Sequence, residues 1–481
     1  MKQQLKSVKF NMVMNAILTM SNIIFPLITF PYVSRILMPD GMGKISFATS
    51  IVAYFSMLAQ LGIPTYGIRT CARIRDDRNK LSATVCELLL LNAVTLVIAY
   101  TAFIVCLCAI PRLRAERNLL VIMSVTIVLN AIGVEWLYKA LEQYAYITIR
   151  SLVFKIIALA AMFLLIHRPE DYVVYGGISI FAASASNVMN FVNLGRLISF
   201  KKNGEKYNLK KHIKPMLVFF WVSVAATIYT NLDNVMLGFM NTDTEVGYYS
   251  GAVKVKTILI GLVTSASVVL LPRVSNYLEK GKREEFNQVL NKTMRLIIIM
   301  AVPLTIYFIF FAKESITFLS GKEFEGAIVP MMIIMPTLLF IGMTNLIGIQ
   351  MMVPLGREKQ VFRSEVWGAV IDFVINLFLI PGYGAAGAAI GTVVAELAVL
   401  IVQLIYTGKD VKVIFSDMPW VKIIAACVVA GAVAVPVKLA DWNSVITLMV
   451  SGCLFFGIYG ISLIIQRESL TIETIKGIVK R

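Results

Sequence analysis

The most constraining feature of this chain is a succession of apolar stretches that runs from Asn11 to Gln466 with little between them. Each stretch is about 20 residues long, which is the length that an α-helix rising ~1.5 Å per residue needs to cross a hydrocarbon core ~30 Å thick. The composition agrees, because 58% of the residues are hydrophobic and only 15% are charged, whereas soluble domains carry roughly 25% charged residues. We therefore expect an all-α integral membrane protein with no room for a soluble domain.

The apolar stretches predict about fourteen transmembrane helices. The expected spans are 12–35, 43–66, 81–110, 117–141, 146–167, 172–199, 215–239, 247–274, 295–318, 326–353, 364–382, 384–407, 420–438 and 444–466. One further segment, 276–293, is polar but has apolar residues at helical spacing. It fits either a short amphipathic helix on the membrane surface or the solvated start of the helix at 295–318.

Lysine and arginine residues are unevenly distributed between the two sides of this expected bundle. Most of the 45 fall in the terminal tails and in the loops on the same side, including dense clusters at 69–80 and 201–214. Short cytoplasmic loops are enriched in positive residues, so we expect both termini to be cytoplasmic. The net charge of +17 then reflects topology and contact with anionic lipids, and does not indicate nucleic-acid binding.

The sequence contains none of the motifs that are typical of soluble-type enzymes or metal proteins. It has no glycine-rich phosphate loop, no nucleophile–histidine arrangement and no metal-ligand spacing. Both histidines, His167 and His212, fall near helix ends, and the Cys106/Cys108 pair is interpreted as apolar filling. The first apolar run is too long for a cleaved signal peptide. We expect no catalytic residue, no cofactor, no metal site and no enzymatic activity.

A weak internal repeat suggests two lobes of six helices each. Three small residues open the second helix at the same spacing as three that open the eighth: Gly43, Ser46, Ala48 and Gly247, Ser250, Ala252. Halves with an even number of helices share one orientation, as in parallel repeats that hold a substrate site at their interface. We expect an N-lobe at 1–200, a basic cytoplasmic linker at 201–214, a C-lobe at 215–407, and two further helices with a cytoplasmic tail at 408–481.

Charged residues inside the spans mark candidate functional positions, because each costs at least ~2.5 kcal/mol at mid-helix unless it faces a partner or a cavity. Asp233 and Lys254 lie at similar depth on either side of an outer turn, so we expect them to pair. Lys256 is on a different face of the same helix as Lys254, and we expect one of the two lysines to face a central cavity. Arg35, which follows Pro31, fits either this cavity or the lipid headgroups.

Two other sets of charged residues lie deep in the expected spans. Glu135 and Lys155 are at similar distances from the turn between the fourth and fifth helices, and Asp372 and Glu396 lie on either side of the turn near 382–384. Each set fits either a contact that fixes helix packing or a site that takes up an ion or a proton. The nearby Gly387–Gly391 spacing predicts close approach of two helices.

Five stretches of the sequence, taken together, carry a family resemblance. They are FPLITFPYVSRIL (25–37), DGMGKISFATSIVAYFSMLAQLGIPTYGIR (40–69), EVGYYSGAVKVKTILIGL (245–262), VVLLPRVS (268–275) and FVINLFLIPGYGAAGAAIGTVVAE (373–396). This combination, which extends from the first to the twelfth expected helix, resembles the Wzx-type polysaccharide biosynthesis flippases. These belong to the multidrug/oligosaccharidyl-lipid/polysaccharide (MOP) exporter superfamily, which includes the MATE carriers.

The resemblance implies a MATE-like fold of twelve to fourteen helices, with two six-helix lobes around a central cavity. It also implies a polyprenyl-diphosphate-linked oligosaccharide as substrate, with cationic cavity residues accepting the diphosphate. Only Arg35, Lys254 and Lys256 can be carried over to this sequence as such residues. Beside Asp233, the amides of Asn231 and Asn234 are suited to hydrogen-bond sugars in the same cavity.

We therefore predict a flippase of the bacterial plasma membrane, also called the inner membrane, that moves a lipid-linked oligosaccharide to the outer leaflet by alternating access. Its expected partners are this glycan, anionic membrane lipids and, as additional candidates, polysaccharide assembly proteins. Two alternatives keep the same fold, namely a lipid II flippase and a cation or drug antiporter, and Lys254 and Lys256 argue against the antiporter. A polysaccharide polymerase or ligase is disfavoured because the outer loops are short.

Overall fold

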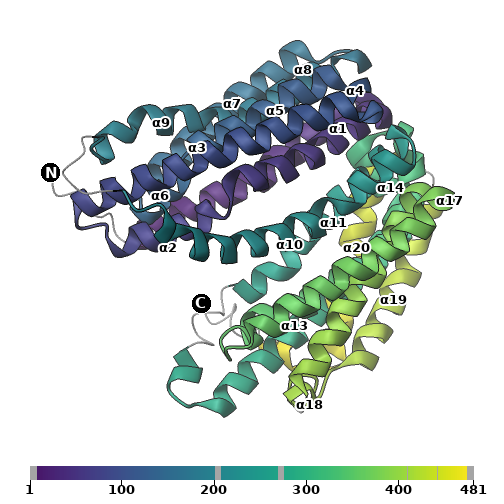
Figure 1. The fold of residues 1–481 in the computed structure, drawn as a ribbon. Coiled ribbons are helices and arrows are strands. Elements are labelled where there is room, and N and C mark those ends of the chain that lie inside the picture. The colour runs from purple at the N-terminus through teal and green to yellow at the C-terminus, as the bar shows by residue number, and fades with distance from the viewer. Residues whose placement is uncertain (1–7, 201–206, 269–275, 409, 441, 474–481) are drawn as a thin grey trace. The chain divides into compact units, whose positions relative to one another are not determined.

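The computed structural model describes residues 8–200, 207–268, 276–408, 410–440 and 442–473. Every regular element within these ranges is helical, as the sequence predicts (Figure 1). Part of the expected linker, 201–206, and the end of the expected span at 247–274 lie outside the described residues.

By its internal contacts the chain divides into two compact units, Met1–Val246 and Gly247–Arg481. The elements of the first unit are α1 (Val8–Gln60), α2 (Ile63–Arg73), α3 (Arg78–Ala109), α4 (Pro111–Ala115), α5 (Arg117–Ile132), α6 (Glu135–Ala140), α7 (Tyr144–Leu165), η1 (Pro169–Asp171), α8 (Tyr172–Ile180), η2 (Phe181–Ala185), α9 (Ser186–Leu197) and α10 (Lys210–Met240). Helix α1 packs against α3, α5, α7 and α10, so it lies at the centre of this unit (Figure 1).

The second unit begins within the next long helix. Its elements are α11 (Asp243–Val268), α13 (Arg283–Phe310), α14 (Ala312–Ser320), η3 (Lys322–Ala327), α15 (Ile328–Ile334), α16 (Thr337–Thr344), η4 (Asn345–Met352), α17 (Glu358–Thr407), α18 (Asp410–Ile414), α19 (Trp420–Leu439) and α20 (Ser444–Ile465). Helix α17 packs against α15 and α16, α13 packs against α16, and α19 pairs with α20.

The described residues contain eleven helices that are long and apolar enough to cross a membrane, or twelve if Lys322–Ile334 and Thr337–Met352, which are bent by 47°, form one broken span. Every expected span overlaps one of these segments. The expected number of fourteen is not confirmed by this count, because Phe10–Arg73 and Glu358–Thr407 each hold two expected spans. At ~1.5 Å per residue, a straight helix over Glu358–Thr407 would reach ~75 Å, more than twice the thickness of a hydrocarbon core.

Both long helices contain a residue with non-helical backbone angles, Met38 (φ 59°, ψ 174°) in α1 and Gly384 (φ 51°, ψ −128°) in α17. The chain folds back on itself around Gly384, since a Cβ atom added to Gly387 would lie 2.6 Å from the carbonyl oxygen of Leu379. A Cβ atom on Gly391 would similarly lie 2.2 Å from an oxygen of the Asn376 side chain. Helix α17 is therefore a hairpin, and the close approach predicted from the Gly387–Gly391 spacing is confirmed.

The polar segment 276–293 is largely part of a transmembrane helix. Residues 283–293 form the first turns of α13, which continues without a break to Phe310. The apolar side chains Phe286, Leu290 and Met294 are 2%, 1% and 0% exposed, so they pack into the second unit. For residues 283–293 the start of a spanning helix is the structure observed, whereas residues 276–279 form a separate helical turn.

Helix α10 belongs to the first unit, although the sequence places it at the start of the C-lobe (215–407). Near its beginning, the Lys211 ammonium lies 2.7 Å from a carboxylate oxygen of Glu87 on α3. Near its end, Arg112 donates from Nε to the carbonyl oxygen of Gly238, at 2.7 Å, and pairs with Asp243. Both ends of α10 are thus fastened to the first unit. The start of the C-lobe at 215, which was inferred from the internal repeat, stays a prediction.

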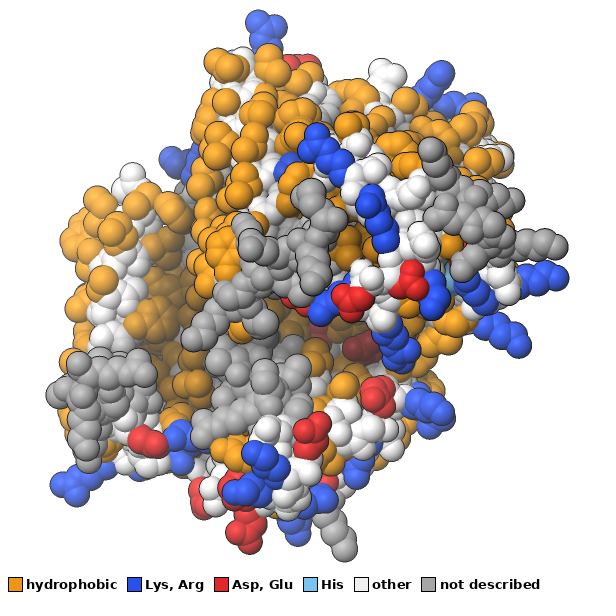
Figure 2. All heavy atoms as spheres, turned by 90° about the vertical axis from the view of Figure 1, so that its left-hand side faces the viewer, with side chains coloured by type: hydrophobic (Ala, Val, Ile, Leu, Met, Phe, Trp, Pro, Cys, Tyr) orange, Lys and Arg blue, Asp and Glu red, His pale blue; other side chains and the backbone are white. Residues whose placement is uncertain are grey.

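Large apolar side chains cover much of the outer surface of the helices. Val192, Leu164 and Phe378 are 78%, 74% and 74% exposed. Figure 2 shows such side chains over broad areas of one face, with Lys and Arg side chains scattered among them. Soluble proteins rarely expose apolar patches of this extent, so these surfaces are suited to contact lipid.

The α17 hairpin gives a direct test of the role of its small residues. We expect Gly387→Ala to destabilise the protein by about 1–3 kcal/mol, because the new methyl group meets backbone atoms that cannot rotate away. The control is Gly382→Ala in the same hairpin, where a Cβ atom meets nothing within 4 Å. Thermal unfolding of both variants in detergent measures the difference. Equal midpoints for the two variants would show that the hairpin tolerates a wider separation.

Candidate functional site

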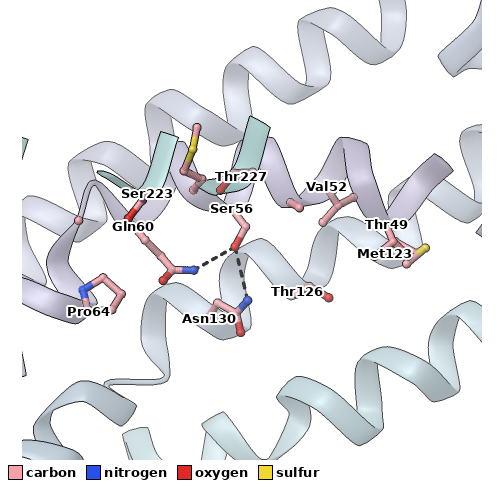
Figure 3. Close-up of a pocket in the computed structure, with 13 residues that line it drawn as sticks. Thr49, Val52, Ser56, Gln60, Pro64, Met123, Thr126, Asn130, Ser223 and Thr227 are labelled. Atoms are coloured by element: carbon pink, nitrogen blue, oxygen red, sulfur yellow. Dashed lines mark hydrogen bonds between the residues drawn. The ribbon is translucent and has the colours of Figure 1, made fainter. Parts of the chain in front are cut away.

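A polar pocket of about 360 Å³ lies within the first unit, between α1, α5 and α10 (Figure 3). It is lined by Thr49, Val52, Ala53, Ser56, Met57, Gln60, Gly62, Pro64, Met123, Thr126, Asn130, Ser223 and Thr227. Hydroxyl and amide groups are interspersed with apolar side chains, and none of these lining residues carries a charge. The pocket is therefore suited to a neutral ligand that both donates and accepts hydrogen bonds.

The polar residues of the pocket share one face on each helix. They recur at intervals of four or seven residues, with Thr49, Ser56 and Gln60 on α1, Thr126 and Asn130 on α5, and Ser223 and Thr227 on α10. Residues at these intervals lie above one another on a helix with 3.6 residues per turn. Three helices thus turn polar stripes toward a common space in the first unit.

Two hydrogen bonds meet at one hydroxyl in the pocket wall, one from within α1 and one from α5. The Gln60 amide donates to the Ser56 hydroxyl at 3.1 Å, and the Asn130 amide donates to the same hydroxyl at 3.4 Å. Figure 3 shows the three side chains pointing toward one another. The carbonyl oxygen of the Asn130 side chain accepts from Ser184 at 3.2 Å and from Asn187 at 3.3 Å, so the pocket wall continues into η2 and α9.

Next to Asn130, the helix that lines the pocket is broken. Helix α5 ends at Ile132, and α6 begins at Glu135 after Val134, whose φ is 37°. A β-branched residue with positive φ is strained. The break frees backbone carbonyl groups, and buried asparagines satisfy two of them: Asn190 donates to Gly133 at 2.7 Å, and Asn92 donates to Ala131 at 2.6 Å.

A second break lies at the end of the pocket, between α1 and α2. Leu61 and Gly62 have φ angles of 43° and 73°. A Cβ atom on Gly62 would lie 2.6 Å from the backbone nitrogen of Phe220 and 2.7 Å from the carbonyl oxygen of Met216, both on α10. Position 62 therefore requires glycine for its positive φ and for the close approach of α10.

The structure places the cavity residues predicted in the first unit as follows. The Arg35 side chain is exposed and donates to the carbonyl oxygen of Pro31 in its own helix. Asn231 donates to the carbonyl oxygen of Thr227 at 3.0 Å, and Asp233 is 8% exposed. Asn234 donates to the Ser50 hydroxyl of α1 at 3.3 Å. None of these predicted residues is among those that line the polar pocket.

Lys254 and Lys256 lie on α11 in the second unit, and both are half-buried. The predicted Asp233–Lys254 pair would join residues of different units and stays a prediction. The same holds for the predicted role of one of the two lysines in a central cavity.

Glu135 and Lys155 have different partners in the structure. The Glu135 carboxylate lies 2.8 Å from the ammonium of Lys139, one turn further along α6. The Lys155 ammonium donates to the Ser21 hydroxyl at 2.8 Å and to the side-chain oxygen of Asn22, both on α1. Lys155 therefore links α7 to α1 through neutral groups.

Asp372 and Glu396 lie in the two arms of the α17 hairpin, and each is 4% exposed. A Cβ atom on Gly391 would lie 3.0 Å from an oxygen of Asp372, which places this carboxylate against the glycine face of the opposite arm. Their assignment as an ion or proton site, or as packing residues, stays a prediction.

The fold and the pocket define a polytopic α-helical membrane protein with broken helices beside a polar cavity. The chain belongs to the polysaccharide biosynthesis protein family, whose profile matches residues 8–278. A second profile, MatE, matches residues 220–378. The family resemblance noted in the sequence is thus confirmed.

Some relatives match most of the chain, and others match about half of it. A protein of Escherichia coli K12 described as an O-antigen transporter is 21% identical over 408 residues, which cover 84% of this chain and 97% of the relative. A Haloferax volcanii protein described as a low-salt glycan biosynthesis flippase is 22% identical and covers 49% of each chain. Among solved structures, lipid II flippase MurJ in an inward closed conformation has a TM-score of 0.72 at 13% identity, and the match covers 94% of this chain and 99% of that one.

Sequence reasoning missed the pocket because its residues are uncharged. Ser, Thr, Asn and Gln are common in transmembrane helices, so their presence does not mark a functional position as a buried charge does. Their signal was the spacing of four or seven residues on one face, as in Ser56 and Gln60 or Ser223 and Thr227. The breaks at Val134 and Leu61 have no such signal, because neither residue type favours positive φ.

We expect the asparagine that supports the α5–α6 break to be important for stability. Asn190→Ala removes the donor to the Gly133 carbonyl and leaves that group unsatisfied, at a cost of about 1–3 kcal/mol. Asn193→Ala is the matched control, because Asn193 lies on the same helix but donates to the Tyr138 hydroxyl at 3.2 Å and is only half-buried. Thermal unfolding in detergent should show the larger loss for Asn190→Ala, and the reverse order would contradict this account of the break.

Proposed function

We propose that this protein is a flippase that moves a polyprenyl-diphosphate-linked oligosaccharide from the cytoplasmic to the outer leaflet, for assembly of a cell-surface polysaccharide. The observation that carries the proposal is the uncharged polar pocket between α1, α5 and α10. Family membership and the relatives described as an O-antigen transporter and as a glycan flippase support it. The activity is transport by alternating access and includes no catalysed reaction.

The physical difficulty of this transport is the loss of water from the sugar hydroxyls. A hydroxyl moved into hydrocarbon without a hydrogen-bond partner costs roughly 2–7 kcal/mol, and a glycan carries several such groups on each ring. The Thr, Ser, Asn and Gln side chains of the pocket replace part of the lost water with donors and acceptors. The prenyl tail stays in lipid throughout and needs no such replacement.

The charged part of the substrate requires a different site. The neutral pocket offers no cation for a diphosphate, so we assign this role to Arg35, Lys254 and Lys256, with Asn231, Asp233 and Asn234 as further cavity residues. Asp372 and Glu396 are the candidates for ion or proton coupling in the second unit, because both are carboxylates in the middle of a membrane hairpin. Glu135 and Lys155 are assigned to packing within the first unit.

A lipid II flippase is the second candidate, favoured by the match to the solved structure of MurJ. A Bacillus subtilis lipid II flippase is also 25% identical over 199 residues, although these cover only 39% of this chain. Complementation separates the two functions: the proposed flippase restores surface polysaccharide to cells that lack their own polysaccharide flippase. A lipid II flippase instead restores growth to cells depleted of MurJ.

The pocket assignment is tested by removing hydroxyls without changing shape. We expect the double variant Thr126→Val/Thr227→Val to lower glycan export by roughly 5- to 150-fold, because two lost hydrogen bonds correspond to about 1–3 kcal/mol. Surface polysaccharide and accumulated lipid-linked precursor are the measurements. Thr19→Val is the control, since Thr19 is exposed on α1 and donates to the carbonyl oxygen of Asn15 in its own helix at 2.9 Å. Normal export by a well-expressed double variant would show that the pocket does not bind the glycan.

The proposed topology places both termini in the cytoplasm of a bacterial cell, in its plasma membrane. We expect Tyr207→Cys, before α10, to be shielded from a membrane-impermeant thiol reagent in intact cells. Thr242→Cys, in the turn after α10, should react. Both substitutions are made in a chain whose six native cysteines are replaced. The opposite labelling pattern would invert the topology.

A further inference from the structure

An arginine in the first unit is buried but has unsatisfied hydrogen-bond donors. Arg150 lies on α7 and is 6% exposed. Its Nε and Nη1 atoms are buried and have no hydrogen-bond partner in the part of the chain that the structure describes. Buried donors of this kind are rare in proteins because each one loses its bonds to water without replacement. Such a group is suited to bind an acceptor that reaches it.

The guanidinium lies against a pair of stacked tyrosine rings. It lies over the ring of Tyr146, 5.6 Å from the centroid, and the Tyr146 ring stacks on that of Tyr138 at 5.1 Å with an interplanar angle of 17°. The Tyr138 hydroxyl donates to the carbonyl oxygen of Asn190 at 2.8 Å, and the Tyr146 hydroxyl donates to that of Met189 at 3.3 Å. A cation–π contact of this kind attracts the guanidinium to the ring and leaves its N–H groups available for hydrogen bonds.

No described carboxylate neutralises Arg150 directly. The acidic group whose charge acts on it is Glu135, and this carboxylate is already bonded to Lys139 at 2.8 Å. A buried cation without a bonded counter-ion is costly, whereas a cation that receives an anion in a site of low dielectric gains strongly from it. The arrangement therefore favours binding of an anion that comes from outside the protein.

We propose that Arg150 binds a phosphate group carried by a lipid, as the planar fork of a guanidinium can hold two phosphate oxygens at once. Arg150 is six residues from the start of α7 at Tyr144, or ~9 Å along the helix, at the end that the proposed topology places at the cytoplasmic leaflet. A lipid diphosphate at that leaflet is the substrate of the proposed function, on which this inference rests. A phospholipid headgroup offers the same chemistry.

The short helix α6 is placed to control access to this site. It contributes Glu135 and Tyr138, and it is bracketed by two non-glycine residues with positive φ, Val134 at 37° and Glu142 at 56°. Residues of this kind store strain that a change of conformation can release. We expect a displacement of α6 to uncover the two buried nitrogen atoms of Arg150.

The proposal is tested by lipid binding to the purified full-length protein in nanodiscs of phosphatidylcholine. Native mass spectrometry measures retention of two added probes, undecaprenyl diphosphate and phosphatidylglycerol. We expect Arg150→Gln to weaken binding at least about tenfold, because two charge-assisted hydrogen bonds are lost. Arg150→Lys keeps the charge but loses the fork, so its binding should be intermediate. Arg196→Gln, which removes an exposed arginine from α9, should bind as the wild type does.

Each outcome decides the proposal. A preference for undecaprenyl diphosphate that depends on Arg150 identifies the substrate as the source of the phosphate, and equal dependence for both probes identifies a general lipid-phosphate site. Equal binding by wild type and Arg150→Gln, or no binding of either probe by the wild type, overturns the proposal. If Arg150→Gln fails to fold, Arg150→Lys provides the same comparison. Glycan export is measured separately, so loss of the proposed function and loss of this site are distinguishable.

Discussion

The structure depends on one constraint, namely that every backbone polar group within hydrocarbon must find a partner inside the protein. Unbroken helices satisfy this by themselves, but the first unit interrupts its helices at Gly62 and at Val134. The second interruption is possible because Asn190 and Asn92 bond to the freed carbonyl groups. The same group of asparagines extends through Asn187 to Asn130 in the pocket wall. The polar cavity and the break that shapes it are therefore parts of one hydrogen-bond network.

The first unit keeps its neutral and its charged groups apart. The pocket is lined by hydroxyls, amides and apolar side chains, while the buried cations Lys155 and Arg150 lie outside it. Lys155 contacts neutral groups of α1, and Arg150 lies over the Tyr146 ring of its own helix. A substrate with an uncharged glycan and a charged diphosphate matches such a division, because each part requires a different environment. Binding the two parts at separate places also fixes the direction in which the substrate lies.

The sequence predicts much of the fold and little of the site. The length of the apolar stretches is enough to locate the spanning segments, because the thickness of the hydrocarbon core determines how long a spanning helix must be. The Gly387–Gly391 spacing predicts the close packing of the α17 hairpin. The number of spans is not set by the element bounds, because α1 and α17 each hold two expected spans on either side of a non-helical residue, Met38 and Gly384. The pocket escaped prediction because uncharged polar residues such as Asn130 carry no solvation signal comparable to that of a buried lysine. Arg150 escaped because its nearness to a helix end made it resemble an ordinary cytoplasmic arginine.

The fastening of α10 at both ends has a mechanical consequence. Its first turn is tied to α3 through Lys211 and Glu87. At the other end, Arg112 of α4 bonds to Gly238 in its last turn and to Asp243, the first residue of α11. Gly62 also brings the backbone of α10 against the α1–α2 connection. A helix held at these three places is expected to move together with α1 and α3. Because Asp243 takes part in this anchoring, the connection between α10 and α11 is also held to the first unit.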